Sequence, residues 1–159
     1  MKKNQKGFSL IELLIVVAII LIIAAIAIPN LIKSKMAANE SSAVGSLRTL
    51  TTAEIAYATA CPAIGFTHTL ADLGTANTCP GGNQQIDSTL QAASKSGYKF
   101  ATVAARASGN TPETLFGWTG TPASVSSGTR GFYVDETGVI RYVPNGNTAT
   151  ADNTSNALQ

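Results

Sequence analysis

One nearly unbroken apolar run close to the start of the chain limits what the rest of it can be. Phe8–Ile28 comprises twenty-one residues and holds a single charged side chain, Glu12. A helix of that length spans roughly 31 Å, close to the thickness of a bilayer core. Three lysines precede the run, so the positive-inside rule predicts residues 1–7 in the cytoplasm and the rest of the chain outside.

Hydropathy alone leaves two ordinary explanations for such a start open. Ala25-Ile26-Ala27 fits the A-x-A cleavage site of a secretory signal peptide, which would be removed. The run also fits an uncleaved signal anchor. Against the first explanation, the run is longer than an ordinary signal core, and helix-forming residues continue beyond Pro29.

The composition argues against several classes of function. The formal net charge is +2, but without Lys2, Lys3 and Lys6 eight basic side chains face nine acidic ones, a balance of −1. We therefore expect no nucleic-acid binding. His68 is the only histidine, and with two cysteines it is too little for a metal site. We expect no catalytic residues, no metal and no cofactor.

Glu12 needs a physical reason, because a charge at the middle of a membrane costs roughly 2.5–3.5 kcal/mol. It lies only about 6 Å along the helix from Phe8, so in a single chain it can reach the headgroups. In a bundle of such helices no water would be at hand, and the carboxylate would need a cationic partner.

The segment KGFSLIE at residues 6–12, with the apolar run behind it, resembles the leader of type IV pilins and their pseudopilin relatives. The resemblance implies that a prepilin peptidase cleaves between Gly7 and Phe8 and that Phe8 is then N-methylated. It also implies that Glu12 pairs with the Phe8 amine of a neighbouring subunit during assembly. Pro29 matches the proline that follows the membrane segment of the family.

The resemblance and the residue pattern together predict an α+β fold, in which a long N-terminal helix packs against a small antiparallel sheet. The first half of this helix is expected to be transmembrane. The expected parts are a cytoplasmic leader at 1–7, a transmembrane and polymerisation half-helix at 8–28, an outer half-helix at 29–60, a disulfide-closed loop region at 61–96, the sheet at 97–144 and a flexible tail at 145–159.

The outer half of the helix is expected to pack on the head. A weak apolar stripe follows helical spacing there: Val44, Leu47, Thr51, Ile55 and Ala58. Glu40 and Glu54 fall on or near this stripe and make it imperfect. Pro29 has no N–H to donate and crowds the carbonyl of Ala25, so we expect a kink or a loosened turn there.

The two cysteines, Cys61 and Cys79, lie on the side of the membrane that is expected to be oxidising. A disulfide between them would close a loop of modest size and stabilise the head by about 3 kcal/mol. Two free thiols are the alternative.

Short elements are expected beyond the long helix. Helical turns are predicted at Thr69–Leu73 and Ile86–Ala93. Strands are predicted at Gly97–Ala107, Leu115–Thr119, Arg130–Glu136 and Val139–Pro144. The last two strands frame Thr137-Gly138, which is typical of a hairpin turn.

The function these observations favour is that of a pilin, a structural and non-enzymatic subunit of a type IV pilus. Its expected partners are copies of itself in a helical filament, the prepilin peptidase, and the assembly platform with its ATPase motor. Its expected places are the inner membrane before assembly and an extracellular filament afterwards. Two alternatives stay open: a major pseudopilin of a type II secretion system, which would stay periplasmic, and a minor pilin acting as an adhesin or DNA receptor.

Overall fold

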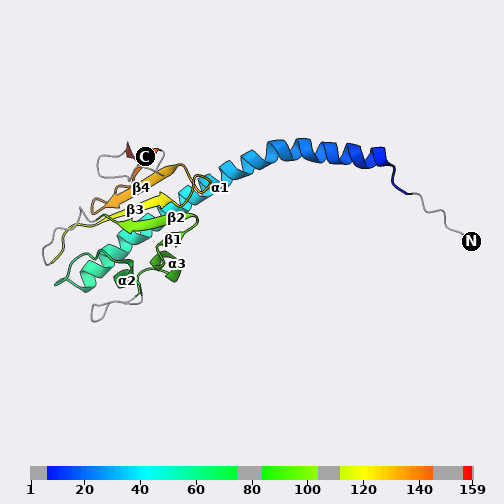
Figure 1. Cartoon of the computed structure of the whole chain (residues 1–159). Coiled ribbons are helices and arrows are strands. Elements are labelled where there is room, and N and C mark those ends of the chain that lie inside the picture. Colours follow the sequence, from blue (N-terminus) through cyan, green and yellow to red (C-terminus); the bar gives the residue numbers. More distant parts are fainter. Residues whose placement is uncertain (1–6, 75–83, 104–111, 145–155, 159) are drawn as a thin grey trace, which may run out of the picture. The chain divides into compact units, whose positions relative to one another are not determined.

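The computed structural model describes residues 7–74, 84–103, 112–144 and 156–158 (Figure 1). The chain divides into two compact units, Met1–Lys35 and Met36–Gln159, here called the N-terminal unit and the head unit. One helix, α1 (Leu10–Ala60), contributes to both units.

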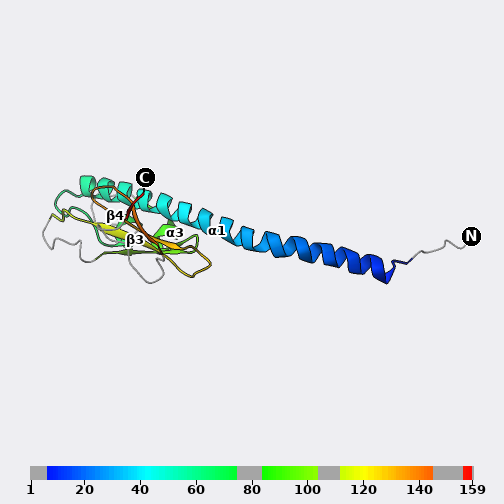
Figure 2. The same cartoon turned by 90° about the horizontal axis from the view of Figure 1, so that it is seen from above.

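The sheet of the head unit is an antiparallel meander, in which each strand pairs with the next one along the chain. Its strands are β1 (Ser94–Lys95), β2 (Tyr98–Thr102), β3 (Gly117–Pro122), β4 (Arg130–Asp135), β5 (Arg141–Pro144) and β6 (Asn156–Ala157). Figure 2 shows the second half of α1 lying along this sheet as a separate layer. The expected fold, a long helix packed against a small antiparallel sheet, is confirmed.

The core of the head unit lies between α1 and one face of the sheet. Because successive strand residues point to opposite faces, each strand sends alternate side chains toward the helix. From the sheet the aromatic members of this core are Tyr98, Phe100, Trp118 and Phe132. From α1 the core includes Leu47, Leu50 and Tyr57.

A glycine in β3 lets the two layers approach closely. A Cβ atom placed on Gly120 would lie 3.3 Å from the Phe100 ring and 3.8 Å from a methyl group of Leu47. The missing side chain therefore leaves room for a helix leucine and a neighbouring aromatic ring over the centre of the sheet.

The buried face of α1 differs from the expected stripe. Leu47 is fully buried and Val44 is partly buried, but Ile55 is 55% exposed. The face that packs on the sheet consists of Glu40, Ala43, Ser46, Leu47, Leu50, Ala53, Glu54 and Tyr57. The expected stripe is wrong at Ile55, because the helix face that packs on the sheet includes Glu40 and Glu54, which the stripe left out.

The predicted strands correspond to β2–β5 with shifted ends. The third predicted strand, Arg130–Glu136, is nearly the same as β4. Gly138 adopts a φ of +71° in the turn before β5, a conformation that glycine tolerates well. The tail was expected to be flexible, but its described residues 156–158 include β6, and the Leu158 N–H donates to the Ile140 carbonyl at 2.8 Å.

The two short helices have their own N-caps. In α2 (Leu70–Leu73), the Thr69 hydroxyl accepts a hydrogen bond from the Asp72 N–H. In α3 (Ser88–Gln91), the Asp87 carboxylate accepts one from the Leu90 N–H. Helical turns were predicted over both segments, and Thr69 and Asp87 are residue types that are favoured at N-caps.

Candidate functional site

The start of α1 brings together three of the residues singled out in the sequence. Gly7 and Phe8 lie just before the helix, and both are exposed, Phe8 to 88%. The helix begins at Leu10, two residues later than the expected start, after Ser9. Glu12 lies in its first turn.

Glu12 has a partner within its own chain. The Ser9 N–H donates to Glu12 Oε2 at 2.8 Å, and the Leu13 N–H donates to the Ser9 carbonyl at 3.3 Å. This is one half of a capping box, in which a glutamate three residues beyond the N-cap bonds the N-cap amide. The S-x-x-E pattern stands in the sequence at residues 9–12 and could have been read there as a helix start.

Nothing in the described fold requires a glycine at position 7. A Cβ atom at Gly7 would meet no heavy atom within 4 Å. The described structure therefore has room for a side chain at this position.

The apolar side chains that follow have no cover in the N-terminal unit. Every large apolar residue from Phe8 to Ile32 is at least 46% exposed. In water this would be a severe liability, because contiguous exposed apolar surface marks an interaction with protein or lipid. By length and composition, α1 is able to cross a membrane.

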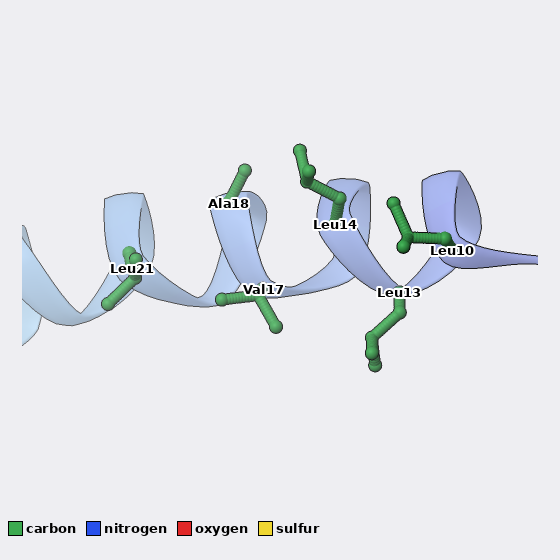
Figure 3. A pocket seen from close by; sticks show the side chains of 6 residues that line it. All are labelled: Leu10, Leu13, Leu14, Val17, Ala18 and Leu21. Atoms are coloured by element: carbon green, nitrogen blue, oxygen red, sulfur yellow. The ribbon is translucent and has the colours of Figure 1, made fainter.

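The exposed surface is grooved. Figure 3 shows Leu10, Leu14 and Ala18 on one side of α1 and Leu13 and Val17 on the other. Both rows follow four-residue spacing, which forms the ridges and grooves through which helices pack on one another. A shallow apolar groove lies between the rows and is also lined by Leu21. Its shape suits the ridge of another apolar helix.

Pro29 lies inside α1, and the helix is continuous through it. The proline nitrogen has no hydrogen, so it cannot donate to the carbonyl four residues back at Ala25. The kink that the sequence predicts at this position stays a prediction.

The cysteine pair falls only partly within the described residues. Cys61 directly follows α1, is buried, and donates its N–H to the Tyr57 carbonyl at 2.8 Å. Cys79 lies outside the described residues. The disulfide between them stays a prediction.

Two buried glutamates in the head unit, Glu40 and Glu54, are the residues that interrupt the apolar stripe expected from the sequence. Glu40 accepts hydrogen bonds from the Thr129 N–H at 2.8 Å and from the side chain of Arg130 at 2.7 and 2.8 Å. Burial alone would raise the pKa of Glu40, but the Thr129 amide and the Arg130 guanidinium outweigh it and hold this pKa below its ordinary value. The pair fastens α1 to the start of β4.

Glu54 is fully buried, and neither of its hydrogen-bond donors in the described part of the chain is a basic side chain. It accepts hydrogen bonds from the indole N–H of Trp118 at 2.9 Å and the Thr67 N–H at 3.0 Å. Burial raises its pKa to about 7, although both donors oppose the rise. Glu54 thus joins α1 to β3 and to the loop after α1.

Among the described residues, no group of three histidine, cysteine or acidic side chains is placed to hold a metal ion. His68 approaches Glu113 at 3.6 Å between Nε2 and Oε2, in the loop region of the head unit. This pair alone offers too few ligands for a metal site.

Comparison with known proteins bears directly on the start of α1. A family described as the prokaryotic N-terminal methylation motif matches residues 2–28. The type IV major pilin protein of Myxococcus xanthus is 54% identical to the chain over 54 residues. The N-terminal segment of this chain is therefore similar to that of type IV major pilins.

Other pilin-family relatives match over the same kind of short segment. The type IV wide pilus major component of Thermus thermophilus is 59% identical over 39 residues. A type IV major fimbrial protein of Dichelobacter nodosus is 56% identical over 52 residues. The three matches cover 34%, 24% and 31% of this chain, and 24%, 30% and 33% of those relatives. The chain thus spans between a quarter and a third of the relatives that it matches. No solved structure matches it.

The methylation motif ends one residue before Pro29, and the large apolar residues that it covers from Phe8 onward are exposed. It includes the candidate cleavage position at Gly7 and the capping glutamate, Glu12. The methylation motif therefore coincides with the exposed apolar stretch of the N-terminal unit.

Proposed function

We propose that this chain is the structural subunit of a type IV pilus. It is made as a membrane-anchored precursor, cleaved between Gly7 and Phe8, N-methylated on Phe8 and polymerised through the first part of α1. The observation that carries the proposal is the uncovered apolar surface of α1 behind the methylation motif. In lipid before assembly, and against neighbouring copies of α1 afterwards, this surface is never left in water.

The proposed cleavage lies before the helix, so that the apolar segment stays on the mature protein. Cleavage after Ala27, as in an ordinary secretory protein, would remove the apolar segment. Cleavage at Gly7 removes only the basic leader and keeps the anchor. Gly7 is exposed and lies outside α1, so the peptide bond after it is accessible.

Glu12 is proposed to receive the new amine of Phe8 from a neighbouring subunit. One of its oxygens already accepts the Ser9 N–H. A carboxylate has lone pairs for further donors, so the cap and an ammonium partner do not exclude each other. Pro29 is proposed to loosen α1 where the helix must adjust during assembly.

The partners and places follow from this cycle. Before assembly the precursor resides in the inner membrane, where the prepilin peptidase acts on it, with the head unit outside the cytoplasm. The assembly platform and its ATPase motor then add it to a helical filament that extends from the cell surface. The role is structural and not enzymatic.

Two measurements test the proposal. The purified protein should have the mass of a chain that starts at N-methylated Phe8, and N-terminal sequencing should read from that residue. A chain that starts at Ile28 would mean an ordinary signal peptide and would refute the proposal.

Electron microscopy of cells with and without the gene separates the pilin from its alternatives. Long surface fibres that disappear on deletion are expected. Loss of protein secretion with no change in fibres would indicate a pseudopilin. Fibres that persist but no longer adhere or bind DNA would indicate a minor pilin.

A further inference from the structure

The charges on α1 are placed at the two ends of its apolar stretch. After Glu12, the next charged residue is Lys33, and Lys35 follows it closely. Twenty-one steps along a helix rise about 32 Å, which matches the hydrocarbon thickness of a bilayer. If Glu12 lies at one surface of the membrane, the two lysines lie at the other.

Both lysines are exposed, and neither has a polar partner among the described residues. Acidic side chains three or four positions away on a helix could have paired with them. The residues at those positions are Pro29, Asn30, Leu31, Ile32, Met36, Ala37, Ala38 and Asn39. None of these is acidic, so the two ammonium groups are available to an outside partner.

The spacing of the two lysines says what kind of partner suits them. Lys33 and Lys35 are two residues apart, which places them about 200° apart around the helix. A protein docked on one side of α1 would reach one of them. A plane of lipid headgroups surrounds the helix and reaches both.

We propose that Lys33 and Lys35 bind the phosphate groups of anionic phospholipids on the outer surface of the membrane. Lysine side chains at the end of a span extend along the helix so that the ammonium group reaches the headgroups. Each lysine near an anionic surface strengthens binding about fivefold. The apolar residues just before them, Leu31 and Ile32, remain in the hydrocarbon.

This inference rests on the proposed function in two respects only. The proposed function determines which side of the membrane Lys33 and Lys35 face, and it predicts that cleavage changes the charge on the opposite side. Before cleavage, Lys2, Lys3 and Lys6 oppose Lys33 and Lys35 across the bilayer. Cleavage after Gly7 removes the first three. The mature subunit is then held electrostatically at its outer surface alone, from which a filament would draw it.

The test compares lysine reactivity within one protein. The full-length chain is placed in phosphatidylcholine vesicles with and without phosphatidylglycerol and treated with a water-soluble acetylating reagent. Mass spectrometry gives the labelling of Lys33 and Lys35 relative to Lys99, an exposed lysine of β2. Phosphatidylglycerol should lower this ratio about fivefold, and about 0.5 M salt should restore it because salt screens exposed charges.

Three outcomes would overturn the proposal. One is a ratio that does not change with phosphatidylglycerol. Another is equal protection by inorganic phosphate in phosphatidylcholine vesicles, which would show binding of any phosphate. The third is protection in phosphatidylcholine that grows with protein density, which would point to an acidic neighbouring subunit.

A second measurement uses variants. After mild detergent extraction from mixed vesicles, the wild type should retain more phosphatidylglycerol than the Lys33→Gln, Lys35→Gln double variant. The Lys95→Gln, Lys99→Gln variant loses the same charge from the head unit and should retain as much as the wild type. Equal retention by all three would contradict the proposal. Neither measurement involves filaments or cleavage, so failure here leaves the proposed function standing.

Discussion

At the scale of single residues, Glu12 has two separable roles, as a helix cap and as a charge. Glu12→Ala removes both, and Glu12→Gln keeps an acceptor at the capping position but removes the charge. We expect both variants to be cleaved and to remain in the membrane, yet to make few or no filaments. The reason is that a buried amine left without its anion costs several kcal/mol at every added subunit.

The measurement is a membrane-fraction blot beside a sheared-filament preparation for each variant. If Glu12→Gln assembles normally and Glu12→Ala does not, the cap is what assembly needs, and the proposed pairing with Phe8 is wrong. Normal filament yield from both variants would show that the acid has no role in assembly.

Glu54 makes the stability of the head depend on pH near neutrality. Its folded pKa of about 7 lies above the ordinary value of 4.5, so between these values the folded chain binds more protons than the unfolded one. The contribution of Glu54 to the free energy of unfolding is therefore fully present below about pH 4.5 and is lost as the pH rises through 7. The full loss is on the order of 3 kcal/mol.

Urea unfolding of the purified subunit at pH 5.5 and pH 8 measures this effect. We expect the wild type to be less stable at pH 8 and Glu54→Gln to show a flatter pH dependence. Glu40 does not contribute to this difference. Its pKa is lowered in the folded state, so its contribution to stability is lost only at acidic pH, below the ordinary pKa of a glutamate. An unchanged slope in Glu54→Gln would contradict the assignment.

At the scale of elements, the contact between Glu40 and Arg130 fastens α1 to β4. The Arg130 guanidinium also lies 5.6 Å from the ring centres of both Phe132 and Tyr142. Arg130→Met would leave Glu40 buried without its cation, and we expect a loss of about 2–3 kcal/mol in the free energy of unfolding. This is less than for a fully buried pair, because the side chain of Arg130 is 40% exposed.

A double-mutant cycle with Glu40→Gln checks this prediction. The double variant should recover part of the loss, since it no longer buries an unpaired charge. The exposed pair of Lys95 and Asp87, joined at 3.0 Å, is the matched control and should contribute much less to stability, because solvent screens it. Additive losses from Glu40 and Arg130 would show that they do not act as a pair.

At the scale of the whole molecule, the proposed placement of the head outside the cytoplasm predicts the state of the cysteines. Cys61 and Cys79 should be joined, because small translocated domains rely on disulfides that an oxidising compartment maintains. A non-reducing digest should contain the linked peptides in mass spectrometry. If both thiols can be alkylated without prior reduction, the disulfide prediction is wrong. That result would also argue against the proposed placement of the head outside the cytoplasm.

Much of the N-terminal unit was determined by the sequence alone. Its elements depend on neighbours in the chain: the apolar run sets the length of the span, and Ser9 with Glu12 starts the helix. The hairpin at Gly138 and the caps at Thr69 and Asp87 are local in the same way. Such features need no distant contact, so they can be predicted from spacing.

Only the tertiary structure decided which face of α1 is buried. Trp118, the donor to Glu54, lies 64 residues away in the chain, and Thr129, a donor to Glu40, lies 89 residues away. A glutamate read without those donors looks like a surface residue, since burying its charge unpaired is costly. The sheet supplies the missing hydrogen bonds, and that is why two acids face the core while Ile55 faces outward.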